Sequence, residues 1–374
     1  IFLVITLLLT CHIIMSHPLF IIKPCSFAKT ELKHGIETTA MKVQAAGGTT
    51  RLGEAGSAHH FQPNSGFYNA GTKIASNFIS VAQTGSANFN SIQAAVDSVP
   101  ENNAQWVEIS IAAGVYQEKV TVPSNKPYII FQGAGMSSTI ISNSETASTV
   151  GTADSATVTI WATNFVAKGM GFENAAPPAQ PGAVNGQAVA VLVANDMAAF
   201  YACGFYGGQD TLFDFQGRHY YKDCYIEGTV DFIFGDGQSQ FISCQLNVKA
   251  QPEAYVSGSI AAQRRSSPDE NTGFVFINCV ISGTGEVYLG RAWGPYSRTI
   301  YMYTYMSDII VPAGWQDWND PSRDGTVTYG QCQCTGPGAV ETYRVPWSHE
   351  FSATDVAPFA DISWINGQAW LLST

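Results

Sequence analysis

A short phrase that recurs along the chain constrains its fold more than any other feature. The phrase has an aromatic residue, two or three further residues, a small residue and, one or two places on, an apolar or aromatic one, and it occurs as FVAKGM, FYACGF, YYKDCY, FISCQL and FINCVI. Its small residue falls, in steps of 34, 21, 20 and 35, at Gly169, Cys203, Cys224, Cys244 and Cys279. Repeats of this length, each with short strands and variable loops, are typical of a β-solenoid.

The repeats predict an all-β protein, a single-stranded parallel β-helix in which each coil lies one strand spacing from the last. The same phrase position then forms a ladder along the stack. Unrelated strands of a β-sandwich are the alternative. Ahead of the repeats, NFNSIQAAVDSVP predicts one short N-terminal capping helix, with Asn90 or Ser91 as its N-cap and Pro100 at its end.

The N-terminal residues differ from the repeats. Residues 1–15 are apolar and of signal-peptide length, so residues 1–28 are expected to be a secretory signal peptide, incomplete at its start, with a membrane anchor as the alternative. Residues 29–74 are polar, rich in Gly and Ala and without a clear period, which predicts an extended arm. The β-helix domain is expected over residues 75–374.

The cysteines have two interpretations, and the sequence leaves both open. Six of the eight lie beyond the apolar leader and suit an oxidising compartment, where ladder neighbours could form a disulfide, Cys203 with Cys224 or Cys224 with Cys244. They could equally be small buried residues of the ladder. Cys332 and Cys334 have no assigned partner.

Charge and motif content exclude several functions. The formal net charge of −11 argues against nucleic acid and anionic membrane surfaces as partners, and it would repel a polyanionic substrate at long range. The chain has no Gly-x-Ser-x-Gly elbow, no His-Glu-x-x-His or similar metal spacing and no phosphate-binding glycine motif before a helix. Neither a metal nor a cofactor is therefore expected.

Two aspartates occupy matching places in successive repeats. Asp210 lies seven residues after Cys203, in CGFYGGQDTLF, and Asp231 lies seven after Cys224, in CYIEGTVDFIF. Coils in register would place the two carboxylates about one strand spacing apart, where they cannot both ionise freely. One would hold a proton while the other stays charged, as in a general acid beside a nucleophile.

A cation and two amides complete the candidate site. Arg291, in YLGRAWG, can hold a carboxylate bidentately and lower its pKa. Trp293, two residues on and so on the same side of a strand, offers a flat face for a sugar ring. Gln209 precedes Asp210, and Gln187 opens the run of NGQAVAVLV; both can donate hydrogen bonds to an oxyanion.

The ordered motifs NGQAVAV, GQDTL, GTVDFIFG and YLGRAW resemble those of the pectin methylesterases (pectinesterases), especially the plant members. GVYQEKV, FENAAP, AQRRSSPDENTGFVFINC and the closing RVPWSHEF and WINGQAWL extend the resemblance from about residue 75 to the C-terminus. It implies a right-handed parallel β-helix that hydrolyses C6 methyl esters of homogalacturonan to release methanol, with no cofactor. It also implies a protein secreted to the plant cell wall.

The resemblance also assigns roles by motif. Asp231 matches the nucleophile, Asp210 the general acid/base and Arg291 the partner of the nucleophile. Gln187 and Gln209 match the oxyanion donors. Substrate-binding positions are implied at Thr152, Gln187, Phe213, Phe234, Arg291 and Trp293.

Several features depart from the family pattern or stay open within it. Ala292 stands where Pro is usual, Phe213 where Tyr is common, and the long inhibitor-like pro-region of many plant members is not expected. The resemblance implies a monomer that acts on methyl-esterified homogalacturonan, with a proteinaceous pectinesterase inhibitor as a candidate partner. The alternatives are another pectin-active β-helix enzyme and a catalytically silent β-helix that binds pectin.

Overall fold

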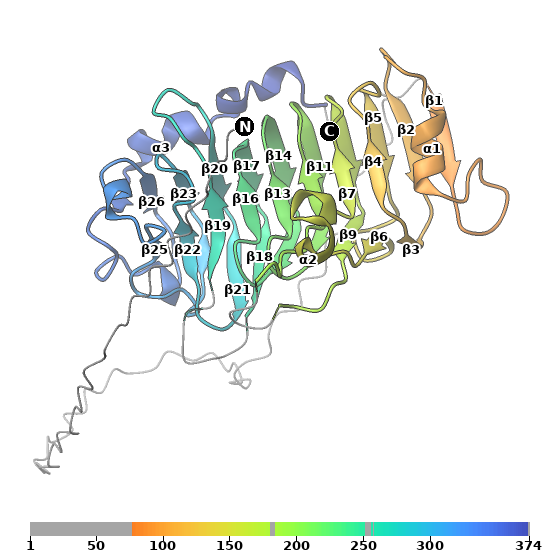
Figure 1. The fold of residues 1–374 in the computed structure, drawn as a ribbon. Coiled ribbons are helices and arrows are strands. Elements are labelled where there is room, and N and C mark those ends of the chain that lie inside the picture. Colours follow the sequence, from red (N-terminus) through yellow and green to blue (C-terminus); the bar gives the residue numbers. More distant parts are fainter. Residues whose placement is uncertain (1–76, 180–183, 251–255, 257, 373–374) are drawn as a thin grey trace, which may run out of the picture. The chain divides into compact units, whose positions relative to one another are not determined.

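The structure is a computed structural model that describes residues 77–179, 184–250, 256 and 258–372, and this part of the chain forms a right-handed parallel β-helix (Figure 1). Successive coils contribute strands to three sheets, here named A, B and C, and all paired strands are parallel. The expected signal peptide (1–28) and polar arm (29–74) lie outside the described residues.

Sheet A is the largest of the three. Its strands, in spatial order, are β1 (Asn77–Val81), β2 (Val107–Ile111), β5 (Ile129–Gln132), β8 (Phe165–Lys168), β11 (Ala198–Tyr201), β14 (Arg218–Lys222), β17 (Gln238–Ile242), β20 (Gly273–Ile277), β23 (Arg298–Met302), β26 (Thr328–Cys332) and β27 (His349–Glu350).

Sheets B and C each contain eight strands. Sheet B consists of β3 (Gly114–Gln117), β6 (Thr139–Asn143), β9 (Gly171–Asn174), β12 (Gly204–Tyr206), β15 (Tyr225–Gly228), β18 (Gln245–Lys249), β21 (Val280–Thr284) and β24 (Tyr305–Met306). Sheet C consists of β4 (Val120–Val122), β7 (Val158–Ile160), β10 (Val191–Val193), β13 (Leu212–Asp214), β16 (Ile233–Gly235), β19 (Ser259–Gln263), β22 (Tyr288–Arg291) and β25 (Trp315–Gln316).

Helices are short and lie at the edges of this stack. They are α1 (Ile92–Ser98), α2 (Ala147–Val150), α3 (Ala353–Ala360) and the 3₁₀ turns η1 (Ala153–Ser155), η2 (Pro321–Arg323), η3 (Pro337–Ala339), η4 (Ile362–Ile365) and η5 (Gly367–Ala369). No helix among the described residues is long and apolar enough to cross a membrane.

The predicted N-terminal helix is present as α1. The Ser91 hydroxyl caps it by accepting from the Ala94 N–H, as expected for one of the two candidate caps. The Glu118 carboxylate adds a second cap, because it accepts from the backbone N–H groups of Ile92 (3.0 Å) and Gln93 (3.1 Å). The buried side chains of α1 join the main core, so that the helix covers the first coils.

The repeated phrase forms the expected ladder, but one of its members is displaced. Tyr201 pairs with Lys168 and Gly204 with Gly171, so Cys203 lies opposite Met170 and not opposite Gly169. Gly169 lies at the corner before the ladder, where the chain turns from sheet A to sheet B. Its assignment to the ladder was therefore wrong by one residue.

That corner requires a left-handed backbone in coil after coil, with φ between 49° and 57°. Non-glycine residues adopt this conformation rarely, because their Cβ crowds the backbone there, yet they occupy most of these corners. The corner residues are Gly169, Ala202, Asp223, Ser243, Asn278, Tyr303 and Gln333. Gly169 therefore meets the backbone requirement of the corner and does not fill a place in the interior.

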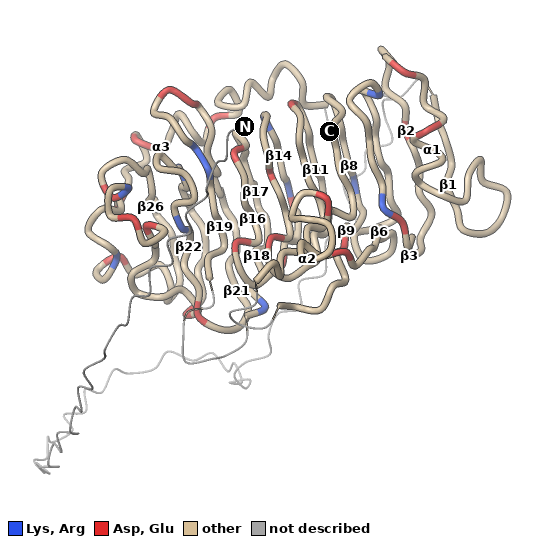
Figure 2. Tube along the Cα trace, viewed as in Figure 1, with Lys and Arg blue, Asp and Glu red and all other residues tan. Residues whose placement is uncertain are grey.

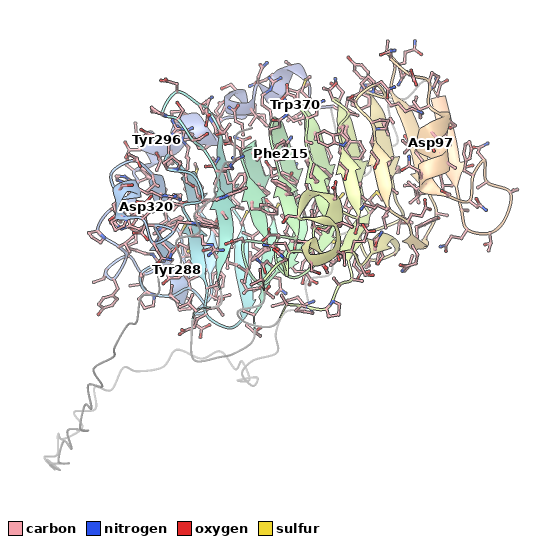
Figure 3. The ribbon with its side chains drawn as sticks, in the orientation of Figure 1. Asp97, Phe215, Tyr288, Tyr296, Asp320 and Trp370 are labelled. Carbon is pink, nitrogen blue, oxygen red and sulfur yellow. The ribbon has the colours of Figure 1, made fainter. Side chains whose placement is uncertain are left out.

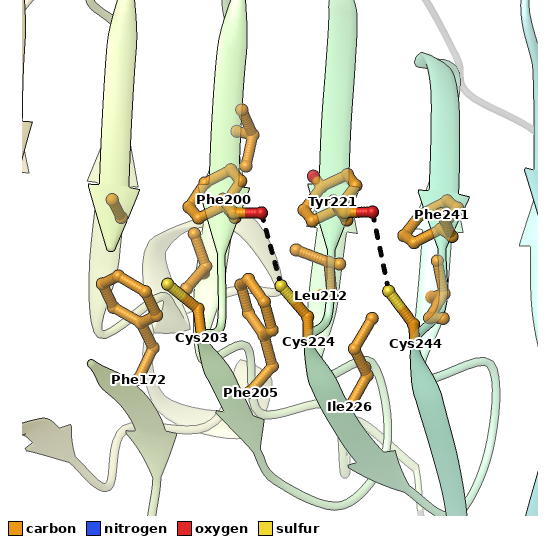
Figure 4. Close-up of a cluster of buried hydrophobic side chains, with 14 of the residues drawn as sticks. Phe172, Phe200, Cys203, Phe205, Leu212, Tyr221, Cys224, Ile226, Phe241 and Cys244 are labelled. Atoms are coloured by element: carbon orange, nitrogen blue, oxygen red, sulfur yellow. Dashed lines mark hydrogen bonds between the residues drawn. The ribbon is translucent and has the colours of Figure 1, made fainter. Parts of the chain in front are cut away.

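The ladder cysteines are free thiols in the structure, as are Cys332 and Cys334. Cys224 donates its S–H to the Phe200 carbonyl and Cys244 to that of Tyr221, in each case on the neighbouring coil (Figure 4). Here they are small buried ladder residues, which was one of the two interpretations. Beside them an aromatic stack runs through the interior, with successive ring centroids 4.5–5.0 Å apart, from Phe200 through Tyr221, Phe241 and Phe276 to Tyr301.

The outer faces of sheets A and C differ in what covers them. The C-terminal helices α3, η4 and η5 cover sheet A, where Val356, Ile365 and Trp370 pack on its outward side chains. The outer face of sheet C has instead a separate apolar cluster that includes Phe213 and Phe234. In the view of Figure 2, Lys and Arg positions are interspersed with Asp and Glu positions along the coils. Phe213, Phe234 and Trp293, three of the predicted site residues, thus lie together on the outer face of sheet C.

Candidate active site

The two predicted carboxylates lie at equivalent places on adjacent coils. Asp210 precedes β13 and Asp231 precedes β16, and these strands pair with Phe213 opposite Phe234. The Asp210 N–H donates to the Val230 carbonyl at 3.0 Å. Because the same offset holds from Cys203 and Cys224 onward, no inserted residue separates the pair. The register predicted from the cysteine spacing is therefore present.

Both aspartates have a left-handed backbone, with φ of 64° at Asp210 and 48° at Asp231. For residues other than glycine this conformation is uncommon and costs free energy, so it persists only where the surroundings enforce it. Here the strands on either side fix it. Two adjacent coils thus hold the same sparsely populated conformation at the residues that bear the carboxylates.

Arg291, at the end of β22, binds the Asp231 carboxylate through both of its oxygens. Its Nε lies 2.7 Å from Oδ1 and 2.9 Å from Oδ2, and its Nη2 also donates to Oδ2. On the other side, its guanidinium lies over the Trp318 ring, with Cζ 4.1 Å from the ring centroid. The guanidinium is thereby fixed between a carboxylate and an aromatic face, which orients Asp231 and favours its ionised form.

The electrostatics distinguish the two carboxyls. Burial raises the pKa of both, since Asp231 is 5% and Asp210 8% exposed. At Asp231 the charge and hydrogen bonds of Arg291 oppose that rise in pKa. At Asp210 the negative charge of the neighbouring Asp231 adds to the rise in pKa that burial causes. The pKa of Asp210 therefore lies well above its usual range, although Arg291 and a hydrogen bond from Gln209 lower it in part. Asp210 therefore retains its proton to higher pH than Asp231.

The two glutamines come together through a local bulge. The Thr211 carbonyl accepts from both Ala190 (2.8 Å) and Val191 (3.3 Å), so two residues of one coil face one of the next. Ahead of the bulge, Ala188 donates to the Gln209 carbonyl at 3.1 Å, which brings Gln187 beside Gln209. The Gln187 Oε1 is buried and has no hydrogen-bond partner among the described residues.

Thr152 lies in the turn that joins α2 to η1, which crosses in front of sheet C in Figure 1. The turn is tied to the glutamine segment: Ala147 donates to the Gln187 carbonyl at 2.8 Å, and Val189 donates to the Ser155 hydroxyl at 3.1 Å. The buried Asn174 amide holds the carbonyls of both Ser155 and Val189. The turn that contains Thr152 is thus held against residues 187–189, while the Thr152 side chain makes no capping hydrogen bond.

An aromatic floor adjoins the carboxylates, formed by Phe213, Phe215, Phe234, Trp293 and Trp318. Phe213 stacks on Phe234 with centroids 4.2 Å apart, and Trp293 lies 6.0 Å from Phe234. Phe215, labelled in Figure 3, packs edge-on against Phe213. Phe213 and Phe234 are almost fully buried, at 8% and 4% exposure, whereas the other three are partly exposed.

The reason given for placing Trp293 beside Arg291 was wrong, although both residues reach the floor. Strand β22 ends at Arg291, and the Trp293 N–H bends back to the Arg291 carbonyl at 3.0 Å. Arg323 holds this turn by donating to the carbonyls of Ala292 and Trp293. A turn, and not strand alternation, therefore directs the indole toward Phe234.

Some residues of the site were missed from the sequence. Trp318 lies far along the chain from Arg291, in a left-handed turn with φ of 64°, and its only signal was a second tryptophan in GWQDW. Phe215 alternates with Phe213 along β13 and could have been found by period-two spacing. Asn174 lies in FENAAP, whose role was not assigned.

A third buried carboxylate, also missed, lies on the inner side of β13. Asp214 is completely buried and accepts from the hydroxyls of Tyr221 (2.7 Å) and Ser239 (2.8 Å). His219 Nδ1 lies 3.1 Å from its Oδ1, and Nε2 lies 2.7 Å from the Asn195 carbonyl. A carbonyl can only accept, so Nε2 must carry a proton, and Nδ1 can donate to the carboxylate only if it carries one as well. Burial lowers the pKa of His219, but the Asp214 carboxylate outweighs that effect, and the pKa is raised.

Within the described ranges, no three His, Cys, Asp or Glu side chains are grouped so as to hold a metal ion. The groups that the floor and the carboxylates present are those of acyl chemistry: a carboxylate paired with an arginine, a carboxyl of raised pKa beside it, and amides nearby.

Comparison with known proteins identifies the family of the chain. The sequence model of the Pectinesterase family matches residues 78–368. The chain is 46% identical over 299 residues to probable pectinesterase 8 of Arabidopsis thaliana, covering 79% of this chain and 76% of that protein. It is 44% identical over 302 residues to pectinesterase QRT1 of the same plant, covering 78% of each.

Solved structures agree in fold as well. The pectin methylesterase from carrot superposes with a TM-score of 0.74 at 36% identity, over 78% of this chain and 94% of that one. A pectin methylesterase in complex with a hexasaccharide superposes with a TM-score of 0.68 at 26% identity, over 79% of this chain and 98% of that one. The chain therefore belongs to the pectinesterase family.

Proposed function

We propose that this member of the pectinesterase family hydrolyses the C6 methyl esters of homogalacturonan, with Asp231 as nucleophile and Asp210 as general acid and base. The products are de-esterified pectin and methanol. The observation that carries the proposal is the bidentate binding of the Asp231 carboxylate by Arg291, beside Asp210, whose raised pKa favours its protonated form. One carboxyl is thus available to attack while its neighbour can donate.

In the first half of the reaction, an Asp231 carboxylate oxygen attacks the ester carbonyl and a tetrahedral oxyanion forms. The backbone places Gln187 next to Gln209, and in this proposal their side-chain amides donate to that oxygen. Collapse of the intermediate breaks the bond to the methoxy group, which takes the Asp210 proton and leaves as methanol. The galacturonosyl unit then remains as an anhydride with Asp231.

In the second half, Asp210 is a carboxylate and takes a proton from water as the water attacks the acyl carbon. The bond to Asp231 breaks, the sugar leaves with a free C6 carboxylic acid, and both aspartates return to their starting states. Arg291 stabilises the Asp231 carboxylate as a leaving group. The chain's own residues supply every proton and electron pair in this cycle apart from the attacking water.

The aromatic floor supports a carbohydrate substrate. Sugar rings have apolar C–H faces that stack on aromatic side chains, and Trp293 and Trp318 are exposed enough to receive them. Phe213 and Phe234 are more buried and would shape the floor beneath. Thr152, in the turn that borders Gln187, would contact the substrate from the other side.

The setting of the reaction follows from the same proposal. A pectin substrate places the protein outside the cell, in the plant cell wall, as a secreted and monomeric enzyme. A proteinaceous pectinesterase inhibitor would act by covering the floor. These assignments go with the substrate and with the apolar leader segment of the sequence.

Methanol release from methylated pectin tests the proposal with the wild type, Asp231→Asn and a matched control, Asp269→Asn. Asp269 is an exposed aspartate outside the site, so its variant has the same chemical change. We expect release by the wild type and the control, and a loss by roughly three orders of magnitude or more in Asp231→Asn. An active Asp231→Asn enzyme would contradict the assigned nucleophile. Backbone cleavage without methanol would indicate another pectin-active enzyme, and pectin binding without turnover a silent β-helix.

A further inference from the structure

Arg264, which follows β19, lies at the edge of the aromatic floor and has no part in the chemistry above. Its backbone N–H donates to the Gly235 carbonyl at 2.8 Å, which anchors it next to the end of β16. Its guanidinium Cζ lies 5.1 Å from the centroid of the Trp293 ring. Trp293 in turn contacts Phe234, three residues after Asp231. Arg264 is thus connected to the nucleophile through two rings of the floor.

The guanidinium of Arg264 is exposed and unpaired. Among the described arginines, it alone donates no side-chain hydrogen bond and makes no ion pair; the others bind carboxylates or backbone carbonyls. The charge of Arg264 lowers the pKa of Asp236 in part, but the Asp236 carboxylate accepts its hydrogen bonds from the Thr272 hydroxyl (2.7 Å) and the Gln263 amide (3.3 Å). The donors of Arg264 therefore remain available to a ligand.

The contrast with Arg291 indicates what that ligand is. Arg291 directs its Nε and Nη2 to the Asp231 carboxylate, so these two donors are already used within the protein. In a chain with a formal net charge of −11, Arg264 is a free cation on the floor where a sugar chain would lie. A guanidinium binds a carboxylate through charge-assisted hydrogen bonds, and it has no comparable interaction with a methyl ester. Its stacking on Trp293 limits its freedom and so reduces the entropy cost of binding.

We propose that Arg264 binds the free C6 carboxylate of a galacturonate unit that neighbours the methyl ester held at Asp231. The inference rests on the proposed function and names the preferred substrate of that same site: an ester flanked by free acid. Each turnover creates a free carboxylate, so the product of one reaction would improve the next ester along the chain as a substrate.

The test compares two galacturonate oligomers of equal length, one fully methyl-esterified and one with free acid beside a single ester. The variants are Arg264→Gln and, as matched control, Lys249→Gln, which removes one positive charge from β18 in sheet B. We expect Arg264→Gln to lower kcat/KM by about 10-fold on the partly free oligomer, the effect of one charge-assisted hydrogen-bonded contact, and by less than about twofold on the esterified one. Lys249→Gln should leave the ratio of the two unchanged.

A binding measurement separates this inference from the proposed function. Fully de-esterified oligogalacturonate should bind the wild type more tightly than Arg264→Gln by about 10-fold, whether or not the protein turns over an ester. Equal binding, or an unchanged kcat/KM ratio, would overturn the role of Arg264. A wild type that releases no methanol would overturn the proposed function and leave the binding result to decide this one. Equal melting temperatures of wild type and variant would show that the change acts on binding and not on folding.

Discussion

Asp210 and Asp214 lie four residues apart on one coil, and their surroundings treat them in opposite ways. Asp214 is completely buried on the inner side of β13, and two hydroxyls and an imidazole compensate its charge. Asp210 faces the outer side, where burial and the Asp231 carboxylate raise its pKa well above the usual range, although Arg291 and one amide lower it in part.

The comparison shows how one coil can hold a carboxylate that stabilises the fold close to one that is suited to proton transfer. A buried charge with a full set of partners is stable and unreactive, whereas one with too few partners is poised to gain or lose a proton. The two sides of a single strand provide both environments. Replacing each acid by its amide should therefore affect different properties of the protein.

The largest effect is expected on activity, at Asp210. In the proposed mechanism Asp210→Asn removes the proton donor for methanol and the base for water, and general acid–base catalysis contributes about 100- to 10,000-fold. We expect kcat for methanol release to fall by that factor.

The melting temperature of the same variant should stay equal or rise. The raised folded-state pKa means that stability from Asp210 is greatest below its unfolded pKa and is lost as pH rises through the folded value. At neutral pH the amide relieves that loss. A fall in melting temperature without loss of kcat would reverse the roles that we assign to the two aspartates.

Asp214→Asn should give the opposite pattern. The change leaves the His219 imidazolium buried without its counter-charge, and breaking a buried pair costs about 3–5 kcal/mol. We expect the free energy of unfolding, measured with denaturant, to fall by that amount. The folded fraction should retain kcat, because the floor and Asp210 lie on the other side of the strand. Unchanged stability would show that Asp214 is neutral in the native protein.

A smaller effect is expected in the pH dependence of stability, at His219. Its folded-state pKa is raised, so the stability it adds is complete below the unfolded value of about 6.5 and is lost as pH rises through the folded value. The melting temperature of the wild type should therefore decline over that pH range. His219→Gln should remove the decline, and a variant that keeps it would assign the transition to other groups.

Much of the catalytic arrangement could be predicted from spacing alone. Equal distances from Cys203 to Asp210 and from Cys224 to Asp231 fix the register, since stacked coils of equal local length align their residues. The helix cap at Ser91 and the approach of Arg291 to Asp231 were predictable as well, the latter because a buried carboxylate needs a cation.

Other features depend on contacts that no local pattern reports. Gly169 and Cys203 look alike in the phrase, yet the first satisfies a backbone corner and the second fills the interior. The partners of Asp214 come from two further strands, so its burial was invisible in LFDF. Trp293 reaches the floor through a turn that Arg323 holds from a distant segment.

The left-handed corners between sheets A and B have a consequence for how such a protein can change. The corner has a fixed geometry from Gly169 to Gln333, although the coils between successive corners differ widely in length. The extra length enters elsewhere, as in the long connection from β18 to β19 compared with the short one from β15 to β16. The corner therefore keeps one geometry in every coil, and insertions elsewhere in a coil can change the loops that border the aromatic floor while the strands keep their alignment. New specificities could arise on this scaffold through loop length alone, with both aspartates left in place.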